Sequence, residues 1–101
     1  MDRRLKLHEI LSSIKGVKKV YFQPPESMKM DYPCIRYNVD NDYNLKANNL
    51  SYNHRIMYLI TVIDKNPDSN IPDALRKIPY CGFDRWYSAD NLNHWVFTLY
   101  F

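Results

Sequence analysis

The stretch Arg55-Ile56-Met57-Tyr58-Leu59-Ile60-Thr61-Val62-Ile63-Asp64 carries the strongest strand signal in the chain. It is rich in residues that favour β-structure, and both of its faces are apolar. One face carries Ile56, Tyr58, Ile60 and Val62, and the other carries Met57, Leu59 and Ile63. Each face must therefore be covered. One helix can cover one face, so the other face needs the second helix or a neighbouring subunit.

A second strand is predicted upstream of this stretch, over Cys34 to Val39, where apolar and polar side chains alternate with the period of a strand. The residues between the two strands, Asp40 to Asn53, favour an extended hairpin arm or a long loop. A segment of this length usually has a function, and its apolar residues have no evident place in a small core. These apolar residues are Tyr43, Leu45, Leu50 and Tyr52.

The N-terminal segment has the spacing of one helical face, which predicts a helix from about residue 3 to 15. Its apolar stripe consists of Leu7, Ile10, Leu11 and Ile14. Asp2 is placed to cap the start of this helix and Gly16 to end it. A short strand over Val17 to Phe22 follows, and the two prolines after Gln23 stop it because neither can donate to a strand ladder.

The C-terminal part predicts a short helix and a strand pair. Ile71, Ala74, Leu75 and Ile78 have helical spacing, with Ser69 or Asn70 as the cap and Pro79 at the end. Two strands, at about 81 to 88 and 94 to 101, then pair across a turn at 89 to 93. The whole chain, residues 1–101, is predicted to be one α+β domain. Its two helices pack on a mostly antiparallel sheet of about five strands.

Composition limits the class of protein. With 46% hydrophobic residues the chain is too apolar for disorder, and no run approaches the roughly 20 apolar residues of a membrane span. The N-terminus has no signal-peptide core, so synthesis in the cytoplasm and no membrane partner are expected. Cys34 and Cys81 lie in apolar strand segments and are interpreted as small buried hydrophobes. The first nineteen residues form a basic patch, which suits either a solvated helix face or an anionic partner.

No pattern of catalytic or metal-binding residues is visible, so we expect no enzyme, no cofactor and no metal. Apart from the pair Asp90 and His94, the three histidines His8, His54 and His94 have no second ligand at helical or hairpin spacing. Gly16 and Gly82 are the chain's two glycines, which excludes phosphate loops and glycine-bounded serine elbows. The aspartates beside turns are read as serving local backbone bonds.

The sequence resembles a family of small phage tail-completion or tail-terminator proteins. The resemblance spans nearly the whole chain through Val20-Tyr21-Phe22-Gln23-Pro24-Pro25, Met30-Asp31-Tyr32-Pro33-Cys34-Ile35, Thr61-Val62-Ile63-Asp64-Lys65-Asn66-Pro67-Asp68-Ser69, Phe83-Asp84-Arg85 and Ala89-Asp90-Asn91-Leu92-Asn93-His94. It implies a virion structural protein that forms a ring, commonly of six copies, on the last ring of a tail tube. Such a ring stops tube growth and offers the surface that docks to the filled head.

The resemblance also implies partners and sites. The partners would be further copies of the chain, the tail tube protein and a head-closure or connector protein, while DNA passes through the ring without sequence-specific binding. The location would be the tail or neck of the virion, reached from the host cytoplasm. Ring contacts are heterologous, and the expected subunit-interface residues are Tyr43, Leu45, Leu50 and Tyr52. The expected docking residues are Arg85, Asp90 and His94, for which a purely fold-keeping role is the alternative.

The sequence is also compatible with two other functions. A head-closure or adaptor protein would work at the same junction with a similarly small subunit. A single-stranded nucleic-acid-binding module would use the basic N-terminus and the nine tyrosines to hold phosphates and stack bases.

Overall fold

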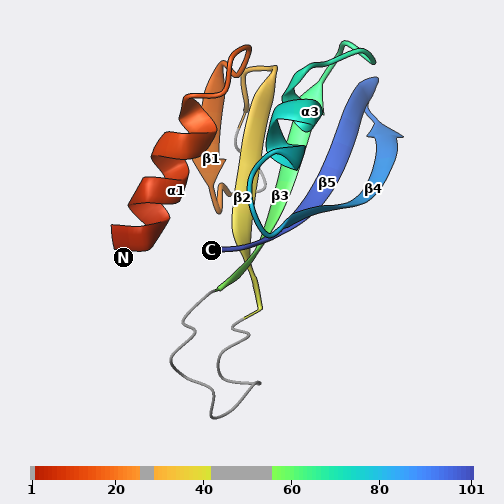
Figure 1. Cartoon of the computed structure of the whole chain (residues 1–101). Coiled ribbons are helices and arrows are strands. Elements are labelled where there is room, and N and C mark those ends of the chain that lie inside the picture. The colour runs from red at the N-terminus through yellow and green to blue at the C-terminus, as the bar shows by residue number, and fades with distance from the viewer. Residues whose placement is uncertain (1, 26–28, 42–55) are drawn as a thin grey trace.

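The computed structural model describes residues 2–25, 29–41 and 56–101. Figure 1 shows helices packed in front of a twisted sheet. In chain order the elements are α1 (Asp2–Ser12), β1 (Lys19–Phe22), β2 (Cys34–Asn41), β3 (Met57–Asp64), α3 (Ile71–Arg76), β4 (Cys81–Ala89) and β5 (Leu92–Tyr100). The predicted α+β class, with two helices and a five-stranded sheet, is confirmed.

The sheet is mixed, with the strand order β1-β2-β3-β5-β4. β1 runs parallel to β2, and the other neighbouring strands are antiparallel. The arm expected between the second and third strands lies outside the described residues beyond Asn41. Tyr43, Leu45, Leu50 and Tyr52 are all in that part of the chain.

Both helices cover the same face of the sheet. The main core joins Leu7 and Leu11 of α1 and Ile71 and Leu75 of α3 to one side of the strands, where Ile35, Tyr37, Tyr58, Ile60, Val62, Phe97 and Leu99 are buried. The amide of Asn70 donates to the carbonyl of Lys15 at 3.0 Å, which ties the end of the first helical segment to the start of the second. The expectation that the second helix could cover the opposite face is therefore wrong.

The opposite face, which we call the far face, is covered at one end by the chain's own loop. Met30 and Tyr32 pack on a second buried cluster that consists of Tyr21, Cys34, Ile63 and Leu92. The backbone N–H of Asp31 donates to the hydroxyl of Tyr21 at 3.1 Å and fixes this loop to β1. Both faces of β3 are therefore buried, as predicted. At this end of the sheet the far face is covered by the chain itself, without a neighbouring subunit.

The element boundaries differ from the expected ones at the turns. α1 begins at Asp2, the residue expected to cap it, and ends three residues early at Ser12. Ile10 is 38% exposed although its spacing placed it on the core stripe. Gly16 has φ +99°, and a Cβ there would approach Oδ1 of Asn70 to 3.3 Å, so the turn after the helix requires glycine. α3 ends at Arg76, before Ile78 and Pro79.

The hairpin between β4 and β5 turns in two residues instead of the five expected. Ala89 pairs with Leu92, and Asp90 and Asn91 between them have φ of 53° and 62°. Two consecutive positive φ values define the type I′ turn, whose twist matches that of the strands it joins. The left-handed conformation is strained for residues with a Cβ but is tolerated best by asparagine and aspartate.

Substitution of Asn91 by glycine is expected to raise the free energy of unfolding by about 0.5–1 kcal/mol, because glycine adopts positive φ without a Cβ clash. Asn91→Ala, which keeps the Cβ and loses the amide, is the control and should lower it. Urea unfolding of the three proteins measures the difference. An Asn91→Gly protein no more stable than Asn91→Ala would contradict the turn assignment.

Candidate interaction surface

Two of the three expected docking residues lie together on the far face of the terminal hairpin. Arg85 of β4 pairs with Val96 of β5, and the next far-face pair along the hairpin is Tyr87 with His94. Arg85 and His94 are therefore diagonal neighbours on one face. Asp90 lies apart from them, in the turn at the end of the hairpin. The structure thus groups Arg85 with His94 and places Asp90 at the tip.

Tyr87 joins these residues and was not among the predicted site residues. Its ring stacks on the imidazole of His94 with centroids 4.6 Å apart and planes 11° from parallel. Nδ1 of His94 lies 3.2 Å from the carbonyl oxygen of Leu92. A carbonyl oxygen can only accept, so this bond requires a hydrogen on Nδ1. The stack and the bond together fix the orientation of the imidazole.

Arg85 contacts its own neighbour in sequence. Its Nη1 lies 2.7 Å from Oδ2 of Asp84, and the two side chains are 59% and 40% exposed. Ion pairs this exposed stabilise a fold very little. The guanidinium remains accessible and able to exchange one carboxylate partner for another.

A β-bulge lies in the middle of β4, between Phe83 and Arg85. Phe83 pairs with Phe97, but Arg85, two positions later, pairs with the adjacent residue Val96. Asp84 is therefore the extra residue, and the alternation of side chains is reset after it. As a result Trp86 pairs with Trp95 and stands on the helix side of the sheet together with Phe83.

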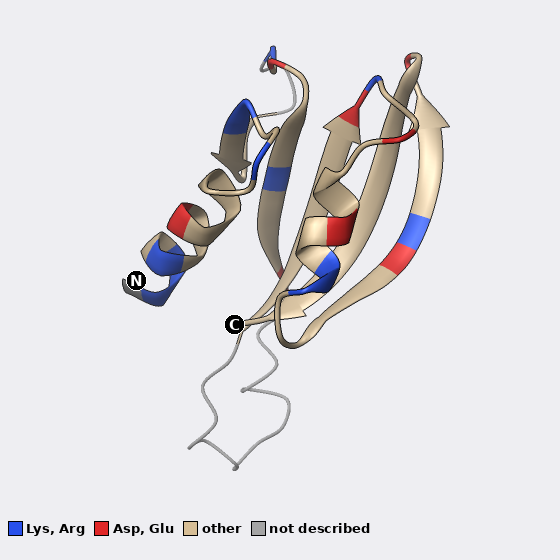
Figure 2. Ribbon diagram, turned by 45° about the horizontal axis from the view of Figure 1, so that its top comes forward, with Lys and Arg blue, Asp and Glu red and all other residues tan. Residues whose placement is uncertain are grey.

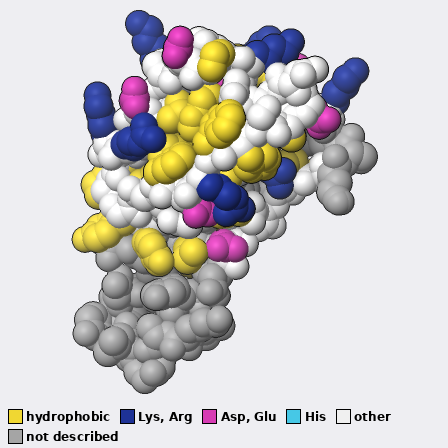
Figure 3. All heavy atoms as spheres, turned by 90° about the vertical axis from the view of Figure 1, so that its right-hand side faces the viewer, with side chains coloured by type: hydrophobic (Ala, Val, Ile, Leu, Met, Phe, Trp, Pro, Cys, Tyr) yellow, Lys and Arg dark blue, Asp and Glu magenta, His cyan; other side chains and the backbone are white. Residues whose placement is uncertain are grey.

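Aromatic side chains line β4, which forms one edge of the sheet. Phe83 is 46% exposed, Trp86 52% and Tyr87 40%. We call these three residues the β4 surface, of which Phe83 and Trp86 lie on the helix side of the edge and Tyr87 on the far face. Figure 3 views this edge directly and shows hydrophobic side chains gathered among charged ones. Edge strands normally avoid such exposure, because a free edge with apolar side chains invites pairing with another chain.

The rings of Phe83 and Trp86 in the β4 surface are held by contacts with neighbouring side chains, although they remain exposed to solvent. The Phe83 ring packs edge-on against buried Phe97, with centroids 5.4 Å apart. The guanidinium carbon of Arg76 lies 5.2 Å from the centre of the Phe83 ring. Nε1 of Trp86 donates to Oδ1 of Asn93 at 3.3 Å. These contacts hold the rings in place while leaving their outer faces open to solvent.

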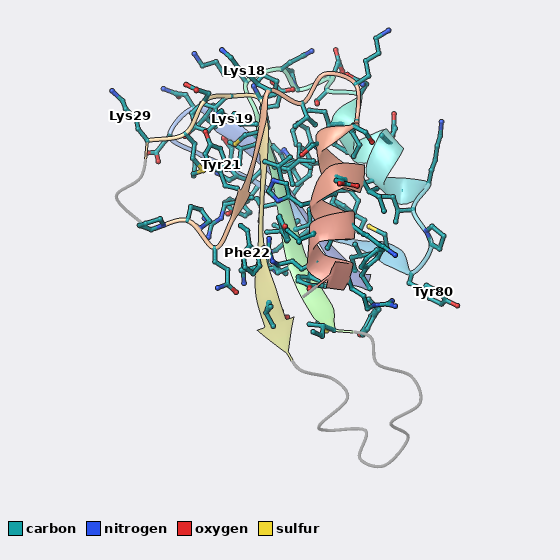
Figure 4. All side chains as sticks on the ribbon, turned by 90° about the vertical axis from the view of Figure 1, so that its left-hand side faces the viewer. Lys18, Lys19, Tyr21, Phe22, Lys29 and Tyr80 are labelled. Carbon is teal, nitrogen blue, oxygen red and sulfur yellow. The ribbon has the colours of Figure 1, made fainter. Side chains whose placement is uncertain are left out.

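A second apolar surface lies on the helix layer, as a groove between α1 and the connection from α3 to β4. We call it the interhelix groove. Its lining includes the apolar side chains of Ile10, Ile78, Pro79, Tyr80 and Phe101, together with Arg3, Lys77 and Tyr100. Figure 4 shows Tyr80 projecting from this side of the molecule. This groove and the β4 surface are two different apolar surfaces in the described part of the chain.

The basic N-terminal region is partly engaged in contacts within the fold. The guanidinium of Arg3 lies over the Phe101 ring at 5.3 Å, and that of Arg4 lies over the Phe22 ring at 4.3 Å. Lys18 and Lys19 lie with Lys29 at one end of the molecule in Figure 4. The lysines at this end share it with Asp31 and Asp64, which line a pocket together with Lys18 and Lys65. Figure 2 shows the charges of both signs along the ribbon.

The cysteines have the environment of inert thiols. Burial raises the pKa of Cys34 to about 12 and that of Cys81 to about 11, so both remain protonated at neutral pH. Within residues 2–25, 29–41 and 56–101, no three His, Cys, Asp or Glu side chains are grouped in a way that could hold a metal. In the same part of the chain, no helix is long and apolar enough to cross a membrane.

The chain matches no protein-family model, no curated protein and no solved structure. The β4 surface combines exposed aromatic side chains with the free edge of the sheet.

Proposed function

We propose that this chain is a non-enzymatic virion structural protein that forms a ring of six copies on the head-proximal end of a phage tail. The ring caps the tail tube, stops its growth and provides the surface to which the head docks. Its partners are other copies of the chain, the tail tube protein and a head-closure or connector protein. DNA passes through the ring without sequence-specific contacts.

The observation that carries this proposal is the exposed aromatic edge formed by β4. A ring needs heterologous contacts, in which one surface of a subunit fits a different surface of the next. The β4 surface and the interhelix groove are two such surfaces, and both are apolar. Aromatic side chains that are already held in place lose little conformational freedom on binding, which favours their use at interfaces.

The predicted arm would add a second contact between subunits. Tyr43, Leu45, Leu50 and Tyr52 keep their proposed role as interface residues, with a surface loop as the alternative. Alanine at both Leu45 and Leu50 is expected to impair ring assembly and lower phage yield. Normal assembly and yield in this double variant would remove the arm from the proposal while leaving the ring contact at β4.

Electron microscopy of particles made without this gene tests the proposal. A missing terminator should leave full heads beside separate tails of irregular or excessive length. Full heads beside tails of normal length would favour the alternative, a head-closure or adaptor protein of the neck. Intact, infectious phage would exclude a structural role at this junction.

A binding experiment separates the two neck functions directly. Purified protein is mixed either with tails isolated without heads or with filled heads that lack tails. A tail terminator should bind the tails, whereas a head-closure protein should bind the heads. Sedimentation of each particle with the protein attached measures the outcome.

Reversal of the charge at Arg85, as in Arg85→Glu, is expected to weaken the joining of heads to tails while the protein stays folded. The exposed guanidinium stands beside His94 and Tyr87 on the far face, and exposed charges act mainly on association with a partner. The readout is the fraction of joined particles, with circular dichroism as the folding control. Loss of folding in this variant would indicate the fold-keeping role instead.

Single-stranded nucleic-acid binding, the alternative from another class, receives less support. Tyr21, Tyr37 and Tyr58 are buried in the fold and so cannot stack on bases. Arg3 and Arg4 pack on the chain's own rings. Salt-dependent binding of the protein to a single-stranded oligonucleotide would support this alternative function.

A further inference from the structure

We propose that the free protein, before it joins any ring, forms a two-fold symmetric dimer by antiparallel pairing of β4 with β4 of a second copy. The two five-stranded sheets then become one continuous sheet with all helices on the same side. This inference concerns the isolated protein and goes beyond the proposed function.

The first step of the argument is that β4 has the main-chain geometry to accept another strand. Within the described part of the chain, β5 is its strand partner on one side, and no strand lies on the other. All of its residues except the two at its ends are exposed. The outward-facing N–H and C=O groups of such an edge are a template for a further strand.

The second step is the register that the side chains select. If the two-fold axis passes between Asp84 and Arg85, the carboxylate of each copy faces the guanidinium of the other. Phe83 of each copy then lies opposite Trp86 of the other, and Gly82 lies opposite Tyr87. The arrangement therefore brings together two opposite-charge pairs and two aromatic pairs, both of which are favourable directly across an antiparallel ladder.

The third step is that the bulge makes this register possible. Residues opposite each other in a ladder must point to the same face, and neighbours in a regular strand point to opposite faces. Asp84 and Arg85 of a regular strand could not face each other across the axis. Here the extra residue places their side chains together, as the 2.7 Å contact shows, and puts Phe83 and Trp86 on one side.

A second copy fits this edge better than an unrelated chain because the edge is complementary to itself. The two Asp84–Arg85 contacts within the separate chains are exchanged for two equivalent contacts between the chains, with no net charge left over. Bulges and charges also occur on edges that stay unpaired, where they prevent aggregation. The two possibilities predict different states of the isolated protein.

Sedimentation velocity of the full chain over a range of concentrations is the first test. We expect a reversible monomer–dimer equilibrium. Asp84→Arg and Arg85→Asp should each raise the dissociation constant at least about tenfold, because like charges then face each other twice across the axis. Asp73→Arg is the matched control, since it breaks the comparable surface pair between Asp73 and Arg76 on α3 and should leave the dimer intact.

Mixing the two variants provides the decisive measurement. Asp84→Arg carries two positive residues at the axis and Arg85→Asp two negative ones, so the mixture should form a heterodimer at concentrations at which each variant alone is monomeric. This rescue cannot arise from misfolded protein. The inference is overturned by a monomer at every concentration, by single variants that dimerise normally, or by a mixture that stays monomeric.

The outcome is independent of the tail experiments. A monomeric protein that still limits tail length would overturn the dimer and leave the terminator function standing. The opposite result is a dimer with the expected variant behaviour in a protein whose loss does not affect tails. That result would support the dimer and overturn the terminator function.

Discussion

Replacement of Phe97 by alanine is expected to lower the free energy of unfolding by about 3–5 kcal/mol, as large-to-small changes of buried aromatic residues do. Phe97 is fully buried in the middle of β5, between β3 and β4, and it contacts the Phe83 ring. Its removal leaves a cavity beneath the β4 surface. Urea unfolding followed by tryptophan fluorescence measures the loss, which is a large part of the total stability of a small domain.

Phe83→Ala is the matched control for this prediction, because the two rings touch but differ in burial. Phe83 is 46% exposed, so its loss should cost less than about 1.5 kcal/mol. A cost at Phe83 equal to that at Phe97 would mean that Phe83 belongs to the core and is not held ready for a partner.

Replacement of Trp86 by glutamate is expected to weaken attachment of the protein to tails by about 30-fold or more, which is the effect of losing an aromatic hot spot of at least 2 kcal/mol. Trp86 is 52% exposed and paired on one side by Trp95, so the free energy of unfolding should change little. Binding to isolated tails measures the attachment. Complementation of a phage that lacks the gene measures the consequence for yield.

Ser88→Glu controls for the added charge, since Ser88 lies on the same strand and on the same side as Trp86. It is exposed and should tolerate glutamate without loss of binding. Equal losses in both variants would point to repulsion along the whole edge. Normal assembly of Trp86→Glu would place the ring contact elsewhere on the subunit.

The elements with regular periodicity could be predicted from the sequence. Alternation along β5 correctly places Trp95, Phe97 and Leu99 on one face and Val96 and Thr98 on the other. The apolar stripe of α3 and the two apolar faces of β3 are confirmed in the same way. These predictions succeed because burial on a defined face forces a period that is visible in the residues themselves.

The β4 surface could not be predicted, because it depends on one extra residue. Strict alternation from Cys81 would put Phe83 and Arg85 on one face and Trp86 on the other. The bulge at Asp84 reverses this and unites Phe83 with Trp86. Nothing in the local sequence distinguishes a bulged strand from a regular one when the strand is exposed on both faces.

The grouping of the site residues could not be predicted either. Arg85, Tyr87 and His94 share one face because of the register that the two-residue turn at Asp90 and Asn91 sets. A five-residue turn would have shifted the pairing. The side of the sheet taken by each helix also depends on the path of the chain, which periodicity within one element does not encode.

The position of β5 has a consequence for how the domain is made. β5 follows all other strands in sequence, yet it lies inside the sheet between β3 and β4. Until residues 92 to 100 emerge from the ribosome, one edge of β3 stays unpaired. During the same time β4 lacks the strand that connects it to the sheet. Contacts that join distant parts of a chain form slowly. A nascent chain halted before β5 would therefore expose the unpaired edge of β3 together with an unpaired β4. Such a chain would be a substrate for chaperones or would aggregate.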